Sequence, residues 1–226
     1  MESQELTRGS GILLSISSLP SDYGIGTLGK AAFRFVDLLV DLKQKYWQVL
    51  PIGPTGYGDS PYQPVSSCAG NPYFIDLDEL IEEGLLSLDE VRCYNWGNND
   101  SEIDYAVLYE NRSKILRKAF SRFDTNAQEF EEFREKNEDW LGDYALFMQL
   151  KTDNLDKNWL DWPDEYKERQ PVALANYQKN NYNNISFWEF CQFEFFKQWR
   201  KVKEYANSRG IMIIGEVPFY VGLDSA

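Results

Sequence analysis

The sequence predicts an α/β protein in which a small parallel β-sheet carries a long, mainly helical insertion. Three short apolar runs, over 11–16, 46–52 and 211–214, are the expected strands. A helical pattern over roughly 28–45 separates the first two runs, and strand–helix–strand is the order of a parallel βαβ unit. The second and third runs are separated by roughly 150 residues, far more than an ordinary loop, so this stretch is expected to be functional.

The first strand is expected to end in a loop over 17–26, because turn-forming residues are concentrated there. Thr27 is the expected cap of the following helix, which has a wide apolar face. The second strand ends at a Pro-Ile-Gly-Pro turn over 51–54. Like other strands of parallel sheets, the first and the third read as apolar on both faces.

The insertion reads as a series of helices joined by irregular segments. A brief extended piece is expected at 71–77, where Asn71 and Asp76 are expected to fix turns. The expected helices cover 78–84 (closed by Gly84), 104–121, 127–138, 139–152 and 186–208, with an irregular connector over 153–170. Trp47 and Trp199 are expected in the core, whereas Trp159 and Trp162 in the connector could contact a ligand. The acidic runs at 79–83 and 129–138 read as solvated helix faces.

Composition excludes several classes of function. The chain has 226 residues, 43% of them hydrophobic, which fits one domain or one domain with a large insertion. Its net charge of −13 argues against nucleic acid and anionic membrane surfaces as partners, because both need a basic footprint. Histidine is absent, which excludes a histidine-based triad and every zinc site that needs imidazole.

The cysteine pattern favours a reducing compartment. Cys68, Cys93 and Cys191 are too far apart to form a CxxC pair, and the polar, acidic N-terminus lacks the features of a secretory signal. No apolar run approaches the length of a membrane span. We therefore expect a cytoplasmic protein with free thiols, no metal and no cofactor.

The most informative stretch is GYGDSPYQ at 56–63, directly after the second strand. Two glycines and a proline make regular structure unlikely, and two tyrosines lie beside a carboxylate, a serine and an amide. Aromatic rings suit the CH-rich face of a sugar, and short polar side chains suit its hydroxyls. The alternative is an ordinary tyrosine-rich surface loop, although loops at strand ends are also where sites usually lie.

The sequence resembles the N-terminal part of the amylomaltases, bacterial 4-α-glucanotransferases (disproportionating enzymes) of the α-amylase clan, which form glycoside hydrolase family 77. The resemblance runs from about residue 8 to the last residue and rests on ordered, spaced blocks. These include YWQVLP at 46–51, GPTGYGDSPYQ at 53–63, AGNPY at 69–73, DYALF at 143–147, and the blocks over 9–14, 17–20, 23–26, 192–193 with 195–196 and 198–199, 210–221 and 224–226.

The resemblance implies a (β/α)₈ barrel about twice this length, of which this chain would hold the first three strands. The expected fold is therefore an incomplete (β/α)₈ barrel with a large, mainly helical insertion after the second strand. Residues 1–56 and 209–226 would be barrel segments. Residues 57–208 would be the insertion, together with the barrel helix that precedes the third strand. Unpaired strands at both edges are expected to invite association with other chains.

The implied chemistry is retaining transfer of α-1,4-glucan segments between maltodextrins by double displacement, with a sugar hydroxyl as acceptor in place of water. The family's nucleophile, acid/base and third acidic residue come from the fourth, fifth and seventh strands. None of them has a counterpart here, so no catalytic residue is assigned and the chain by itself is expected to be inactive.

The resemblance also implies residues that bind substrate. Tyr62 matches a tyrosine that stacks on the sugar next to the cleaved bond, and Asp59, Ser60 and Gln63 belong to the same loop. For the last three, holding the shape of the loop is an equal alternative. Glu216 stands where the family usually has an aspartate that hydrogen-bonds this sugar, and a structural salt link is its alternative. Tyr57 and Tyr105 resemble two aromatics of a secondary glucan-binding spot, or else they pack in the core.

Three functions follow from these observations. The first is an N-terminal part of a 4-α-glucanotransferase that acts on maltose, maltodextrins and starch, with the C-terminal part of the enzyme as its partner. The second is a non-catalytic carbohydrate-binding module, and the third is a non-functional truncated fragment. The absence of a terminal cap after 222–226 favours the first over a module.

Overall fold

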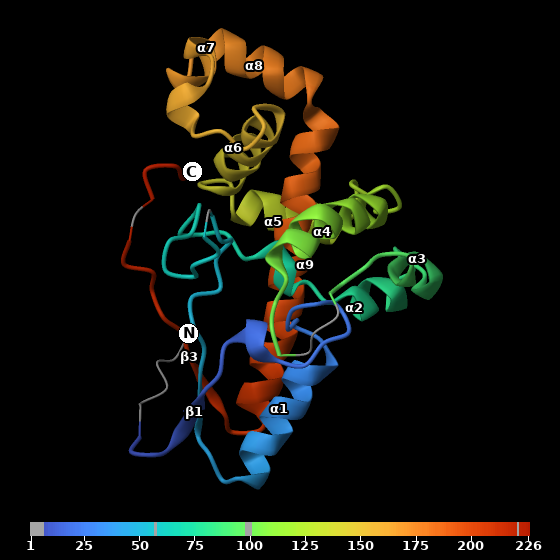
Figure 1. Cartoon of the computed structure of the whole chain (residues 1–226), viewed down its shortest axis with the longest axis vertical. Coiled ribbons are helices and arrows are strands. Elements are labelled where there is room, and N and C mark those ends of the chain that lie inside the picture. The colour runs from blue at the N-terminus through green and yellow to red at the C-terminus, as the bar shows by residue number, and fades with distance from the viewer. Residues whose placement is uncertain (1–6, 57, 98–100, 221) are drawn as a thin grey trace.

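A three-stranded parallel sheet lies at one end of the molecule (Figure 1). The structure is a computed structural model that describes residues 7–56, 58–97, 101–220 and 222–226. The strands, in sheet order, are β1 (Gly11–Leu13), β2 (Tyr46–Gln48) and β3 (Met212–Ile214). This confirms the α/β class and the three strand positions, although each strand is shorter than predicted.

One long helix, α9 (Tyr182–Ser208), runs from the helical end of the molecule to the sheet, where α1 (Lys30–Asp41) lies beside it (Figure 1). The other helices are α2 (Leu77–Glu82), α3 (Leu88–Arg92), α4 (Tyr105–Phe120), α5 (Gln128–Lys136), α6 (Leu141–Asp153), α7 (Asp164–Lys167), α8 (Pro171–Asn180) and the 3₁₀ helices η1 (Ile16–Ser18), η2 (Pro72–Phe74) and η3 (Trp159–Asp161).

The two faces of the sheet differ in what covers them. Ile12, Trp47 and Ile213 are aligned across the three strands and pack in the main core, into which α1 and α9 also pack.

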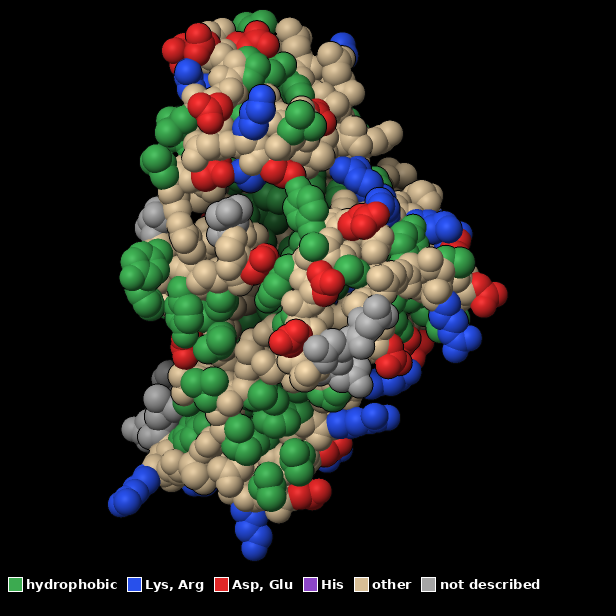
Figure 2. Space-filling view, in the orientation of Figure 1, with side chains coloured by type: hydrophobic (Ala, Val, Ile, Leu, Met, Phe, Trp, Pro, Cys, Tyr) green, Lys and Arg blue, Asp and Glu red, His purple; other side chains and the backbone are tan. Residues whose placement is uncertain are grey.

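The next aligned row is Leu13, Gln48 and Ile214. Because successive side chains of a strand point to opposite faces, this row lies on the other face. There Leu13 is 54% exposed and Ile214 is 37% exposed. The side chains of β1 and β3 on this face are apolar, as the sequence predicted, but they are only partly covered. Figure 2 shows hydrophobic side chains gathered over the sheet end of the molecule.

Thr27 is not the cap of α1. Its hydroxyl is buried and donates to the Asp76 carboxylate at 2.5 Å, while α1 begins after Gly29 without a side-chain cap. Asp76 in turn accepts from the backbone N–H of Glu79 at 3.2 Å and caps α2, as predicted for a turn-fixing residue. Asp76 thus joins the start of α1 to the start of α2.

Two glutamines of α9 hold the segment after β2 by its backbone. The Gln192 side chain accepts from the N–H of Gly70 at 2.7 Å and donates to the carbonyl of the same residue at 3.0 Å. Gln198 pairs with Asp76 in the same way, at 2.7 and 3.3 Å. A Cβ atom on Gly70 would lie 2.0 Å from the Phe195 ring, so only glycine allows this close approach. These contacts hold the segment over 70–76 against α9.

Several elements of the insertion differ from the prediction. The extended piece at 71–77 contains the 3₁₀ helix η2, with Asn71 as its cap. The helices α3 and α8 were not predicted, and α9 begins four residues earlier than expected. Trp162 is 6% exposed and packs in a second core, so it is not available to a ligand. That core joins α6, α8 and α9 through Ala145, Leu146, Leu150, Tyr177 and Ile185.

The acidic run of α2 is more than a solvated face, because it forms ion pairs with neighbouring helices. Glu79 contacts Lys201 of α9 at 2.5 Å, and Glu83 contacts Lys197 at 2.7 Å. Lys197 also contacts Glu194 at 2.7 Å. The Glu194 side chain is completely buried, and its second carboxylate oxygen has no hydrogen-bond partner among the described residues.

We predict that Glu194 makes stability fall as pH rises. Burial raises the pKa of this carboxyl from its ordinary 4.5 to about 7, although the Lys197 ammonium opposes the shift. The folded chain therefore binds more protons than the unfolded chain between these pH values, and stability decreases across that window. Glu194→Gln should raise the free energy of unfolding by about 1–3 kcal/mol at pH 8 and change it little at pH 4.5.

Urea unfolding of both proteins from pH 4.5 to 8 measures this difference. Glu135→Gln, at an exposed position of α5, is the control and should leave the pH profile as it is. An unfolding free energy that differs equally at both ends of the range would contradict the prediction.

Candidate functional site

The candidate site lies where β2 and β3 end, because the chain leaves both strands at the same edge of the sheet. After β2 the chain folds back through 53–66, and Thr55 pairs with Pro64 across the base of this loop. The tip turns at Gly58 (φ +88°) and Asp59 (φ +54°), where positive φ favours glycine and costs little for aspartate. The loop thereby carries Tyr62 back towards the segment that follows β3.

Glu216 is the centre of the site. Its two carboxylate oxygens accept from the Tyr62 hydroxyl at 2.6 Å and from the Gln48 amide nitrogen at 2.7 Å. These hydrogen bonds, the one from Tyr62 first, lower the pKa of the Glu216 carboxyl. The same bond raises the pKa of the Tyr62 hydroxyl. The site therefore holds an ionised carboxylate beside a protonated phenol.

Tyr62, which bonds this carboxylate, is the first of three neighbouring aromatic rings. The Tyr62 and Phe219 ring centroids lie 5.4 Å apart, and those of Phe219 and Tyr220 lie 4.8 Å apart. Phe219 is 71% exposed and Tyr220 is 63% exposed. Exposed rings next to a charged hydrogen-bond acceptor can bind a ligand that has both apolar faces and hydroxyls.

Ser60 forms two hydrogen bonds within its own loop. Its hydroxyl accepts from the backbone N–H of Tyr62 at 3.4 Å, and its carbonyl accepts from the N–H of Gln63 at 3.3 Å. Ser60 thus shapes the turn that presents the Tyr62 ring, while the Gln63 side chain is exposed on the same loop. Partial burial raises the pKa of the Asp59 carboxyl at the tip of the loop.

The second pair of predicted aromatics is only partly described. Tyr57 lies outside the described residues. Tyr105 is half-buried at the start of α4, where burial and then the charge of Asp59 raise the pKa of its hydroxyl. The same two causes, in the same order, raise the pKa of Tyr73 to about 12. Asp59 therefore acts electrostatically on two tyrosines outside its own loop.

The end of the described chain ties this region to the helical end of the molecule. Asp224 accepts from Lys151 of α6 at 2.6 Å, and the indole N–H of Trp159 donates to the Leu223 carbonyl at 2.6 Å. The backbone N–H of Ala226 donates to the Val65 carbonyl at 2.8 Å. Trp159 therefore holds the segment after β3 by a hydrogen bond. Its place in the connector did not predict this contact.

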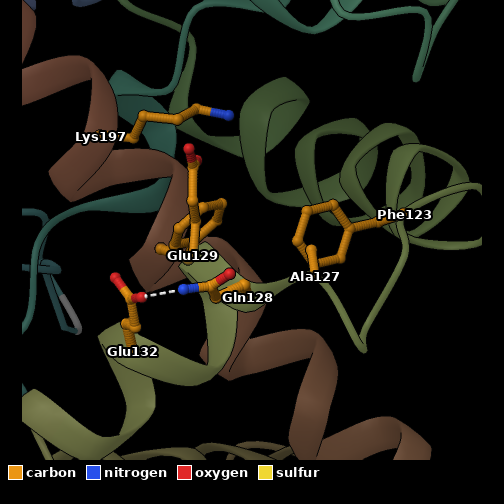
Figure 3. A pocket seen from close by; sticks show the side chains of 7 residues that line it. Phe123, Ala127, Gln128, Glu129, Glu132 and Lys197 are labelled. Atoms are coloured by element: carbon orange, nitrogen blue, oxygen red, sulfur yellow. Dashed lines mark hydrogen bonds between the residues drawn. The ribbon is translucent and has the colours of Figure 1, made fainter.

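A separate pocket of about 540 Å³ lies between α5 and α9 (Figure 3). Phe123, Ala127 and Phe193 form its apolar part, and Gln128 donates to Glu132 at 2.7 Å on its rim. None of the residues that the sequence analysis assigned to a site lines it. Within the described ranges, no group of three or more acidic or cysteine side chains is placed to hold a metal ion, and no helix is long and apolar enough to cross a membrane.

Gln48 and Phe219 are the site residues that the sequence analysis missed. Gln48 does carry a signal, because it is a polar side chain inside an otherwise apolar strand run, YWQVL. Phe219 lies three residues after Glu216, but no pattern in the sequence distinguishes it from a phenylalanine of the core. Only the geometry shows that Gln48 bonds Glu216 and that Phe219 packs against Tyr62.

Comparison with known proteins places this geometry in context. Residues 14–226 match the family described as 4-alpha-glucanotransferase. The chain is 45% identical over 214 residues to a 4-alpha-glucanotransferase of Clostridium butyricum, covering 94% of this chain and 44% of that protein. It is also 45% identical over 224 residues to one of Streptococcus pneumoniae, covering 97% and 44%. The chain thus spans 44% of the length of these curated relatives.

The structure resembles solved structures in the same way. The amylomaltase of Streptococcus agalactiae, solved in complex with acarbose, superposes with a TM-score of 0.92 at 42% identity, over 97% of this chain and 45% of that one. The amylomaltase of Corynebacterium glutamicum gives a TM-score of 0.68 at 18% identity, over 96% of this chain and 31% of that one, which shows a shared fold alone.

Proposed function

The chain belongs to the 4-alpha-glucanotransferase family, and on that premise we propose that it supplies the sugar-positioning part of an enzyme that transfers α-1,4-glucan segments between maltodextrins. The observation that carries the proposal is the Gln48–Glu216–Tyr62 arrangement at the ends of β2 and β3. It places a ring and an ionised carboxylate side by side, as a sugar with an apolar face and hydroxyls requires.

The proposed fold is the first three strands of a (β/α)₈ barrel. Residues 1–56 and 209–226 are the barrel segments, and 57–208 are the mainly helical insertion with the barrel helix before β3. The uncovered row of Leu13, Gln48 and Ile214 supports this arrangement, because it would face the interior of a closed barrel. The site then lies at the carboxyl ends of the strands, where barrel enzymes place their sites.

In this proposal the chain binds the donor and leaves bond cleavage to other residues. The Tyr62 ring lies against the sugar next to the cleaved bond. Glu216 has about two acceptor positions left after its two hydrogen bonds, and these accept sugar hydroxyls. Retaining transfer needs a nucleophilic carboxylate and an acid/base carboxylate, which the family resemblance places on later strands.

Several further assignments belong to the same proposal. Maltose, maltodextrins and starch are the proposed substrates, supported by the acarbose complex of the Streptococcus agalactiae relative. Asp59, Ser60 and Gln63 border the donor site on the loop of Tyr62. Tyr57 and Tyr105 form a secondary glucan-binding spot, and the effect of the Asp59 charge on the pKa of Tyr105 supports a position of Tyr105 near this loop. The C-terminal part of the enzyme is the proposed partner, in the cytoplasm.

Transfer activity is tested with what we call the completed protein, which is this chain extended to the full length of its relatives. We expect it to convert maltotriose into glucose and longer maltodextrins, as measured by chromatography. Hydrolysis of maltotriose to maltose and glucose without longer products, or no turnover of any α-1,4-glucan by a folded completed protein, would contradict the proposed function.

A further inference from the structure

The row of side chains on the uncovered sheet face contains one polar residue. Gln48 is aligned with Leu13 on one side and Ile214 on the other, and both neighbours are aliphatic. Gln48 is half-buried, and removing an amide from water is unfavourable unless the amide forms hydrogen bonds. The Gln48 amide nitrogen donates to Glu216, 168 residues further along the chain, at 2.7 Å.

The direction of both bonds to Glu216 is fixed by chemistry. An ionised carboxylate can only accept, so Gln48 must present its NH₂ group and Tyr62 must donate its hydroxyl proton. Both bonds are charge-assisted, and such bonds are stronger and more directional than neutral ones. The pKa of the Glu216 carboxyl is lowered by both, which agrees with an ionised group at neutral pH.

The position of the Tyr62 ring depends on this carboxylate. Tyr62 is on a loop that folds back from β2, and its ring is packed against Phe219, which is itself 71% exposed. The hydroxyl bond to Glu216 is therefore the contact that ties the ring to the sheet. The Glu216 side chain is in turn held by Gln48, whose backbone is fixed within the central strand.

We propose that Gln48 is a positioning residue that sets the Tyr62 ring for the donor sugar through Glu216. We call the three residues the Gln48–Glu216–Tyr62 relay. This inference rests on the proposed function and goes beyond it, because it assigns a role to a strand residue that touches no sugar. It also explains how a glutamate serves at this position. Its longer side chain is held at both oxygens, which fixes the extra methylene that distinguishes it from aspartate.

The relay is tested first without any activity. Gln48→Met keeps the shape of the side chain and removes the amide. In the 226-residue chain, we expect it to speed hydrogen exchange of residues 59–63 about tenfold while exchange in α9 stays the same. Tyr62→Phe should give the same change. Exchange at 59–63 that is unaffected by both variants would overturn the relay, whatever the enzyme does.

The second test is a double-mutant cycle in the completed protein. Gln48→Met and Tyr62→Phe should each lower kcat/KM for maltotriose about five- to thirtyfold, mainly through KM. The two together should be no worse than the more severe single variant, because both break the same relay. In a Glu216→Ala background each should have no further effect.

The outcomes separate the two proposals. Independent, multiplying effects of the two variants would contradict the relay but leave the proposed function in place. A completed protein without transfer activity would contradict the proposed function, and the hydrogen-exchange experiment would still decide the relay. A loss of stability in Gln48→Met with unchanged KM would assign Gln48 a purely structural role and would also overturn the relay.

Discussion

Tyr62→Ala in the completed protein is expected to lower kcat/KM for maltotriose about 10- to 100-fold while changing the melting temperature by only a few degrees. The ring is half-buried on a loop and packs against the exposed Phe219, so its removal opens no cavity in the core. Aromatic stacking on a nucleic-acid base is worth about 1–3 kcal/mol, and a sugar face should give a similar or smaller amount. Loss of the hydroxyl bond to Glu216 adds to that effect.

Steady-state kinetics and thermal unfolding of the same preparation measure the two effects together. Tyr220→Ala is the matched control, because Tyr220 is exposed on the neighbouring segment and its ring contacts Phe219 instead of Glu216. We expect the control to be closer to wild type in kcat/KM. A large fall in melting temperature with unchanged kinetics would show that Tyr62 packs the loop and does not bind the donor.

Gln192→Met is expected to give the largest loss of stability, about 2–5 kcal/mol in the free energy of unfolding. Methionine has nearly the same shape as glutamine, so the change removes both hydrogen bonds to Gly70 without creating a cavity. The Gly70 N–H and carbonyl are buried and would be left unpaired, and each such group costs about 1–3 kcal/mol. The loop after β2 would then separate from α9.

Urea unfolding followed by circular dichroism measures this loss. Gln178→Met, at an exposed position of α8, is the control and should stay within about 0.5 kcal/mol of wild type. If Gln192→Met were as stable as the control, the pairing between α9 and Gly70 would not be what holds the segment after β2 against α9.

The strands and the longer helices could be predicted from the sequence because their signals are local. Apolar runs located β2 and β3, and periodicity located α4, α5 and α6 within a few residues. The short helix α3 also carries a local signal. Ser87 and Glu90 form a capping box, in which the Ser87 N–H donates to the Glu90 carboxylate at 2.9 Å. That pattern in the sequence could have revealed the helix.

The contacts between distant segments could not be predicted, because no local pattern encodes them. Thr27 has the composition and the place of a helix cap, yet its hydroxyl bonds Asp76 because α2 begins beside α1. Gln192 and Gln198 read as ordinary helix residues until the backbone of 70–76 is placed against α9. Trp162 was placed in a connector that turned out to fold onto α6.

The site residues also divide into those that could be predicted from the sequence and those that could not. Tyr62 and Glu216 could be proposed from the family resemblance, and the structure brings them within hydrogen-bond distance. Gln48 could not be assigned, because its role depends on a carboxylate that arrives from the far end of the chain.

The central claim is that this chain positions the donor glucan and contributes none of the carboxylates that cleave it. The most direct test is chromatography of maltotriose incubated with the purified 226-residue chain, free of host enzyme, beside the completed protein. We predict that the 226-residue chain releases no glucose and forms no longer maltodextrin, while the completed protein does both. Glucose and longer maltodextrins formed by the 226-residue chain, and abolished by Glu216→Ala, would contradict the claim.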